Sequence, residues 1–189
     1  MDNRKAQVLD AARERFLRFG VKKTTMDEIC GDAGISKKTL YEFFRSKEDL
    51  FLAVFIREAL SNRDYILQKV ESIEGPLEKI RCMVRVAVER IRKQKFMIQV
   101  LSDESDLYAP YLKEPFRQQV ESAILDLFVP LLEDGIRRGE IRRLEPRPVA
   151  YFMFKLFQTF TYAKTASIRG DEKDINELID FVLEGISAR

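Results

Sequence analysis

A short stretch of the chain carries cationic and hydroxyl side chains at helical spacing. Lys37, Lys38, Thr39 and Tyr41 follow Ser36 directly or within a few positions. Ammonium groups neutralise phosphate and reach O6 and N7 of guanine, while hydroxyl groups bind phosphate oxygens. This stretch therefore has the chemistry to bind a polyanion. Taken alone, the same residues also suit a solvated helix face on which the tyrosine ring is partly buried.

The composition excludes most of the common kinds of enzyme. The 189 residues include no histidine, which removes Ser-His-Asp and Cys-His nucleophiles, histidine general bases and metal sites built on imidazole. The two cysteines lie far apart and predict neither a zinc knuckle nor a disulfide framework. We expect no metal ion, no cofactor and a reducing, cytoplasmic location. An enzyme using the carboxylates Asp103, Glu104 and Asp106 stays conceivable, although their spacing is equally that of a solvated loop.

The charge is unevenly distributed along the chain. Residues 1–47 carry 11 Lys and Arg against 7 Asp and Glu, whereas residues 48–189 carry 22 against 24. The basic excess at the amino end indicates a polyanionic partner for that part only. The most apolar run, residues 149–168, includes Lys155, Gln158 and Lys164, so it predicts a buried helix and not a membrane span.

Apolar periodicity and stop signals predict an all-α chain of about nine helices. Residues with spacings of three and four recur along most of the sequence, and no alternation bounded by hairpin turns is present. Gly20 predicts the end of the first helix, and Pro130 a kink within the seventh. The predicted helices span residues 4–19, 26–33, 37–44, 47–74, 77–91, 96–101, 116–138, 148–163 and 173–185.

The second and third predicted helices have the lengths of a helix-turn-helix. Thr25 and Glu28 have the spacing of a capping box, and Gly34 is placed to end the helix that they begin. Ser36 can cap the following helix. This would be the second helix of the motif, which is the one that enters the major groove of DNA. Thr24 and Thr25 can offer hydroxyl and N–H groups to one phosphate, and Lys47 can meet another from the next helix start.

One pattern of residues extends over positions 4–51. It consists of Val8-Leu9-Asp10-Ala11-Ala12, Phe16, Gly20, Thr24-Thr25, Ile29, Ala33-Gly34-Ile35-Ser36-Lys37, Thr39-Leu40-Tyr41, Phe44 and Ser46-Lys47-Glu48-Asp49-Leu50. This pattern resembles the TetR family of bacterial repressors and covers about a quarter of the chain. The resemblance implies a helix-turn-helix DNA-binding domain over residues 1–47, a helical effector-binding and dimerisation domain over residues 48–189, and a homodimer.

Carried over by position, the resemblance implies operator contacts that go chiefly to phosphate. Lys38 departs from the family pattern, in which glycine is very common at this position, and Glu42 stands where a hydrogen-bonding aromatic residue or histidine is common. Glu42 can accept a hydrogen bond from cytosine N4, or it can repel phosphate. The predicted DNA-binding residues are Thr24, Thr25, Ser36, Lys37, Lys38, Thr39, Tyr41, Glu42 and Lys47.

A single helix-turn-helix reads too few base pairs to stand out from non-specific binding. We therefore expect a homodimer on a palindromic operator, held by the last two predicted helices in an intermolecular four-helix bundle. Their apolar stripes are broad, although both could instead be intramolecular core. The predicted interface consists of Phe152, Leu156, Phe160, Ala163, Leu178, Ile179, Val182 and Ile186.

The resemblance also implies an effector pocket in the C-terminal domain. Aromatic and methionine side chains suit an apolar, adaptable cavity, although any one of them can equally be plain core. The expected function is a transcriptional regulator, a repressor released from its operator by a small, mostly hydrophobic ligand. A helical adaptor that binds proteins stays open as an alternative. The candidate pocket residues are Met83, Phe96, Met97, Phe116, Phe128, Phe154 and Phe157.

Overall fold

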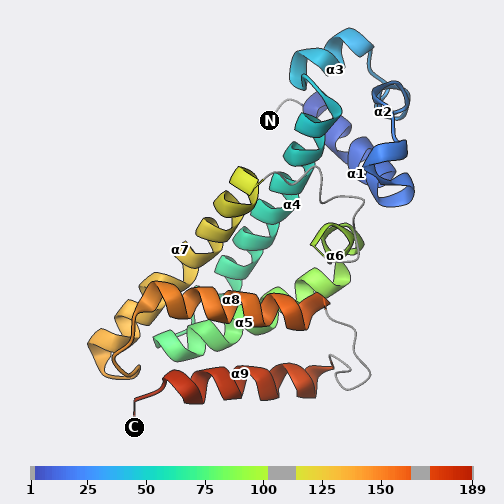
Figure 1. Cartoon of the computed structure of the whole chain (residues 1–189). Coiled ribbons are helices and arrows are strands. Elements are labelled where there is room, and N and C mark those ends of the chain that lie inside the picture. The colour runs from blue at the N-terminus through green and yellow to red at the C-terminus, as the bar shows by residue number, and fades with distance from the viewer. Residues whose placement is uncertain (1–2, 102–113, 163–170, 189) are drawn as a thin grey trace. The chain divides into compact units, whose positions relative to one another are not determined.

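The computed structural model describes residues 3–101, 114–162 and 171–188, and these residues form α-helices joined by short connections (Figure 1). The all-α prediction is confirmed, and one isolated β-bridge joins Ile141 to Ser187. None of the helices in these ranges is both long and apolar enough to cross a membrane. The helices are α1 (Asn3–Lys23), α2 (Met26–Ala33), α3 (Lys37–Phe43), α4 (Lys47–Val70), α5 (Pro76–Lys93), α6 (Lys95–Leu101), α7 (Glu114–Arg138), α8 (Pro146–Tyr162) and α9 (Glu172–Ile186).

The chain divides into two compact units. One unit comprises Met1–Ser61 and Gln94–Lys113, and the other comprises Asn62–Lys93 and Glu114–Arg189. The division falls within α4. Each unit has a core of its own.

The core of the first unit contains aromatic rings from three helices that pack edge to face. The rings of Phe16 in α1 and Phe51 in α4 meet edge to face with centroids 5.7 Å apart, and Phe51 meets Phe96 of α6 at 6.3 Å. All three side chains are almost fully buried. Burying these rings stabilises the unit by several kcal/mol in total, at roughly 25 cal/mol per Å² of apolar surface. The start of α4 and α6 therefore belong with the three N-terminal helices.

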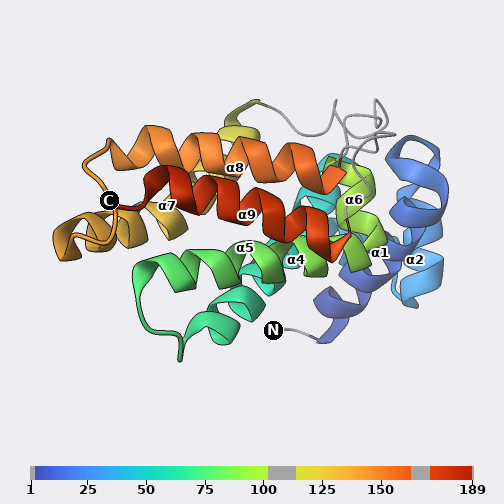
Figure 2. The same cartoon turned by 90° about the horizontal axis from the view of Figure 1, so that it is seen from below.

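The core of the second unit lies among α5, α7, α8 and α9 and includes the end of α4. Helix α8 packs against α7 and α5, and α9 packs against α5 (Figure 2). Leu132 of α7, Ile80 of α5 and Ile179 of α9 are each at most 1% exposed. An ion pair between Arg81 and Asp180 also joins α5 to α9. This unit is thus a helical layer structure with an apolar centre.

Candidate DNA-binding site

Helix α2 has the two end signals that the sequence predicts. The Thr25 Oγ1 accepts a hydrogen bond from the Glu28 backbone N–H at 3.3 Å, and the Glu28 carboxylate accepts one from the Thr25 backbone N–H at 2.8 Å. At the other end Gly34 has φ 65° and ψ 33°, a left-handed conformation that glycine adopts without steric cost. The Ile35 N–H then donates to the Cys30 carbonyl at 3.1 Å. The capping box and the turn that positions α3 are confirmed.

Helix α3 buries one side and exposes the other. Ser36 caps it, because its Oγ accepts from the Thr39 backbone N–H at 3.2 Å. Leu40 is fully buried and is the single buried residue of this helix, while Tyr41 is 51% exposed. The short helix therefore has one anchoring side chain and a solvent-facing surface. We define the α3 face as the exposed or half-exposed residues Ser36, Lys37, Lys38, Thr39, Tyr41 and Glu42.

The two lysines of the α3 face differ in their surroundings. The Lys37 Nζ donates to the Asp27 carboxylate at 2.6 Å, and this hydrogen bond raises the pKa of Lys37 above its ordinary value. Among the described residues Lys38 has no ion-pair partner. A phosphate can therefore bind Lys38 without breaking an existing contact, whereas at Lys37 it must compete with Asp27. Both ammonium groups are accessible, so the α3 face is a cationic surface.

Ion pairs hold α2 against α1. The Arg15 guanidinium donates to Asp32 through Nε at 2.5 Å and Nη2 at 3.1 Å, and its Nη1 lies 3.1 Å from the Glu28 carboxylate. The hydrogen bond from Arg15 lowers the pKa of Asp32. The pKa of Glu28 is lowered first by the hydrogen bonds from Thr25 and then by Arg15. These contacts orient the helix that precedes the turn.

Two of the predicted DNA-binding residues, Thr24 and Lys47, form hydrogen bonds within the protein in this conformation. Thr24 is 1% exposed, and its hydroxyl donates to the Gly20 carbonyl at 2.8 Å. In this conformation the Thr24 hydroxyl is therefore buried and bonded to the segment where Gly20, with φ 77°, breaks α1, and it does not face solvent as predicted. The Lys47 ammonium donates to the carbonyls of Thr24 at 2.8 Å and Lys22 at 3.3 Å. Lys47 thus ties the start of α4 to the segment before α2.

The sequence pattern missed one cation beside the α3 face. Arg45 is exposed and stands between Phe44, which caps the end of α3, and Ser46, whose Oγ accepts from the Asp49 backbone N–H at 3.1 Å. Its signal in the sequence is a single arginine outside any helical pattern, which predicts nothing by itself. Its position after α3 places a further positive charge next to the predicted contacts.

Comparison with known proteins finds a matching family model and similar regulators. Residues 8–54 match the family model described as "Bacterial regulatory proteins, tetR family". YhgD of Bacillus subtilis strain 168, an uncharacterized HTH-type transcriptional regulator, is 29% identical over 194 residues, which cover 98% of each chain. The amino-terminal part of the chain is therefore similar to the DNA-binding domain of the TetR family. It is a transcriptional regulator of the TetR type with a helix-turn-helix DNA-binding domain.

Solved structures of other regulators have the same fold as this chain. The fatty acid degradation regulator FadR from Bacillus halodurans superimposes with a TM-score of 0.78 at 18% identity and covers 100% of this chain and 99% of its own. FadR from Bacillus subtilis in complex with stearoyl-CoA gives a TM-score of 0.71 at 20% identity, with 95% of each chain covered. At these identities the likeness shows the fold. The carboxylates of the enzyme alternative, Asp103, Glu104 and Asp106, lie outside the described residues.

The predicted dimer residues divide into two groups. On α8, Phe152 is 67% exposed and Leu156 is 39% exposed, as a surface for a partner requires. On α9, Ile179, Val182 and Ile186 are buried in the core of their own chain and are not exposed as the predicted interface requires. This row faces the core because α9 packs against α5. Leu178 is half-buried, while the Phe160 side chain and Ala163 lie outside the described residues.

The exposed aromatic side chain of α9 was not predicted. Phe181 is 73% exposed and belongs to neither of the two apolar rows that the sequence shows on this helix. A single phenylalanine between an aspartate and a valine gives no periodic signal. Phe152 and Phe181 are named here the α8/α9 aromatic residues, and Leu156 is a further exposed apolar residue of α8.

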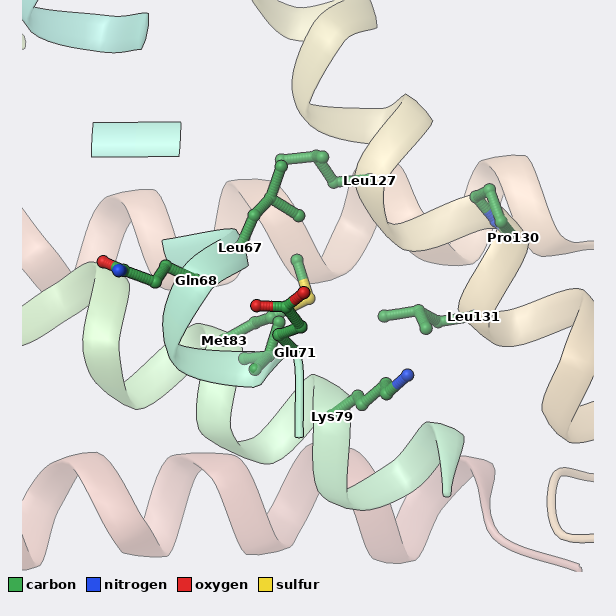
Figure 3. A pocket seen from close by; sticks show the side chains of 9 residues that line it. Leu67, Gln68, Glu71, Lys79, Met83, Leu127, Pro130 and Leu131 are labelled. Carbon is green, nitrogen blue, oxygen red and sulfur yellow. The ribbon is translucent and has the colours of Figure 1, made fainter. Parts of the chain in front are cut away.

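One of the seven predicted pocket residues, Met83, lines the hollow found in the second unit. Phe96 and Met97 are buried in the first unit, and Phe128 and Phe157 are buried in the core of the second. Phe154 is half-buried, and the Phe116 side chain lies outside the described residues. The hollow has a volume of about 520 Å³ and is lined by Leu67, Gln68, Val70, Glu71, Lys79, Met83, Leu127, Pro130 and Leu131 (Figure 3).

Proposed function

We propose that this regulator binds a palindromic operator as a homodimer and represses transcription until a small, mostly hydrophobic ligand releases it. The α3 face carries this proposal. Buried Leu40 fixes one side of the helix, and the Thr25 cap and the Gly34 turn set its start, so Lys37, Lys38 and Tyr41 are presented outward. A helix of this kind fits a major groove about 12 Å wide.

The residues of the α3 face take different roles in the proposed complex. We assign base recognition to Lys38, because its ammonium is unpaired among the described residues and can reach guanine O6 and N7. Tyr41 and Thr39 supply hydroxyl groups to phosphate oxygens. The Lys37 ammonium leaves the Asp27 carboxylate and binds a phosphate instead. Arg45 adds a contact to the DNA backbone.

The remaining assignments follow from the structure of α2 and α4. The exposed Thr25 and the N-terminus of α2 can receive one phosphate, since the first N–H groups of a helix point away from it. Glu42 is exposed at the end of the α3 face and accepts a hydrogen bond from cytosine N4. Thr24 and Lys47 act by positioning α2 and the start of α4.

Dimerisation is assigned to the α8/α9 aromatic residues. Large apolar side chains that are half or more exposed lose contact with water when a second copy covers them, and clustered aromatic residues dominate such interfaces. Phe152 and Phe181 satisfy this condition on two different helices. A two-fold symmetric pair then presents two copies of α3 to half-sites about 34–36 Å apart on the DNA.

Release is assigned to binding in the second unit. The hollow of about 520 Å³ is mostly apolar and has the size of a small-molecule site. Helix α4 supplies residues to both units, so it connects this site to the DNA-binding unit within the chain. Release requires a ligand that prefers the non-binding arrangement by roughly 1–3 kcal/mol. Acyl-CoA thioesters are the first compounds to test, because stearoyl-CoA is bound in the FadR structure from Bacillus subtilis.

Selection of bound fragments from random duplex DNA tests this function. We expect a palindrome, bound about a thousandfold more tightly than random duplex at physiological salt. Lys38→Ala should relax the selected sequence, whereas Lys173→Ala, which removes an exposed charge on α9, should leave it unchanged. Absence of any sequence preference in the purified protein would contradict the proposal.

A further inference from the structure

The hollow of the second unit combines an apolar surface with two charges of opposite sign. Leu67, Leu127 and Leu131 provide apolar side chains from α4 and α7, and Met83 provides a polarisable one from α5. Glu71 and Lys79 also line it. A volume of about 520 Å³ lies within the range of small-molecule sites, roughly 300–1,000 Å³. The occupant must therefore match both an apolar wall and a charge.

Neither charge is favoured by the dipole of the helix next to it. Glu71 directly follows the C-terminus of α4, where the helix dipole disfavours an anion. Lys79 is in the fourth position of α5, where the dipole disfavours a cation. Within the described ranges no ion pair joins these two side chains or joins either of them to another residue. Within the described residues neither charge is therefore neutralised by an ion pair.

The two charges differ in how well water solvates them. Glu71 is exposed, whereas Lys79 is half-buried. Figure 3 shows the Lys79 side chain extending toward Leu131, while Gln68 points away on the other side of the hollow. An ammonium group beside apolar side chains is less hydrated than one in open water, so a counterion stabilises it more. Lys79 is therefore the charge that gains most from a ligand.

We propose that this hollow binds an amphipathic anion, with the apolar chain against Leu67, Leu127, Met83 and Leu131 and the anionic group on the Lys79 ammonium. This proposal rests on the ligand-responsive function and specifies the class of ligand. The exposed Glu71 accepts a hydrogen bond from a polar group such as a hydroxyl or amide. A carboxylate or a phosphate on an apolar chain has the required chemistry.

Isothermal titration calorimetry on the full chain tests the charge preference with probes of equal chain length. The probes are decanoate, decyltrimethylammonium and decanol, and decanoyl-coenzyme A distinguishes a free carboxylate from a thioester whose anionic groups are phosphates. We expect decanoate or decanoyl-coenzyme A to bind most tightly. Tighter or equal binding of decyltrimethylammonium overturns the proposal, and so does the absence of binding by all four probes.

Three variants test whether the Lys79 side chain sets the preference for an anionic probe. Lys79→Gln should raise the dissociation constant of the anionic probe by about tenfold or more, because it removes a charged hydrogen bond. Lys79→Arg should keep most of the affinity, and Lys173→Gln should change nothing, since Lys173 is exposed on α9 outside the hollow. An unchanged dissociation constant in Lys79→Gln overturns the proposal. Thermal melts of each variant verify that it is folded.

Measurements of operator binding distinguish a failure of this inference from a failure of the proposed function. Lys79 lies in the second unit, so ligand-free Lys79→Gln should bind the selected palindrome as the unsubstituted chain does. Failure of the anionic probes together with normal operator preference overturns the ligand class alone. Loss of sequence preference in the unsubstituted chain overturns the proposed function, whichever probes bind.

Discussion

The α3 face and the surface of α9 are both exposed, but they differ in what they expose. Helix α3 presents lysines and a tyrosine around a single buried leucine. Helix α9 presents Phe181 to solvent at 73% exposure, although five of its other residues are buried. A polar exposed surface needs no cover, whereas an exposed phenylalanine costs free energy until something removes it from water.

The difference between α3 and α9 shows under which conditions the sequence predicts which side of a helix is buried. The seven residues of α3 include one residue that must be buried, and its caps define both ends, so one orientation satisfies all of them. The 15 residues of α9 include apolar side chains on more than one row. Several orientations of α9 bury a comparable apolar area, and packing against α5 selects among them.

The largest expected effect comes from making the α9 surface polar. Phe181→Glu should dissociate the dimer and weaken operator binding by about thirtyfold or more, because truncating a central aromatic anchor costs roughly 2 kcal/mol or more. Light scattering gives the mass, and gel shifts give the affinity. Glu177→Gln, at an exposed position of the same helix, is the control. A dimer that survives both Phe181→Glu and Phe152→Glu would show that these rings are not the interface.

A smaller effect is expected on the α3 face. Lys38→Ala should lower operator affinity by about 1–3 kcal/mol and relax the preference at one base pair. Lys69→Ala on α4 removes an exposed lysine outside the first unit and should have no such effect. Binding constants on the palindrome and on single-base variants measure this. If Lys38→Ala weakened binding equally on every duplex, Lys38 would contact phosphate and not a base.

The turn between α2 and α3 permits a matched pair of glycine substitutions. A Cβ atom at Gly34 or at Gly31 would meet no atom within 4 Å, so sterics do not distinguish the two sites. Gly34 has φ 65°, and Gly34→Ala should cost roughly 1–2 kcal/mol of unfolding free energy. Gly31 lies inside α2, and Gly31→Ala should add about 0.5–1 kcal/mol. Urea unfolding measures both, and equal effects would show that backbone conformation does not set the turn.

The smallest expected effect is the pH dependence of the contacts between α1 and α2. The pKa values of Glu28 and Asp32 are lowered from their ordinary values of 4.5 and 3.8. An acid with a lowered pKa stabilises the fold above its unfolded pKa, and this stabilisation is lost as the pH falls through the folded value. The first unit should therefore lose stability as the pH falls below these ordinary values.

Substitution of Arg15 tests the origin of that pH dependence. Arg15→Gln removes the partner of Asp32 and part of the environment of Glu28, so the melting temperature should depend less on pH in the acid range. Arg18→Gln, at an exposed site on the same helix, is the control. Melts followed by circular dichroism measure the slope. A slope that Arg15→Gln leaves unchanged would assign the acid dependence to other carboxylates.

Local signals in the sequence predicted the parts of the structure that local physics decides. Thr25 and Glu28 lie three positions apart and cap each other, and Gly34 adopts the left-handed conformation that ends α2. Gly20 breaks α1, as predicted, although the helix resumes for a few residues after it. These features depend on contacts between residues close in sequence, so their spacing is visible without the fold.

Contacts between distant residues account for what the sequence did not predict. The Lys47 ammonium is taken by the carbonyls of Thr24 and Lys22, more than twenty positions away. Phe96 pairs with Phe51 and so places α6 in the first unit. An apolar side chain shows in the sequence that it will be buried, but not by which neighbours, because many partners bury the same area.

By itself, the amino-acid sequence determined that this chain is helical, that its amino end is a helix-turn-helix with an outward cationic surface, and that it is a TetR-type regulator. Capping, glycine conformation and charge act over a few residues and can be seen in order along the chain. The tertiary structure decided which row of α9 is core, which side chains remain exposed on α8 and α9, and which residues surround the hollow with Lys79. Burial is non-directional, so only the packed helices select among the many arrangements that apolar periodicity permits.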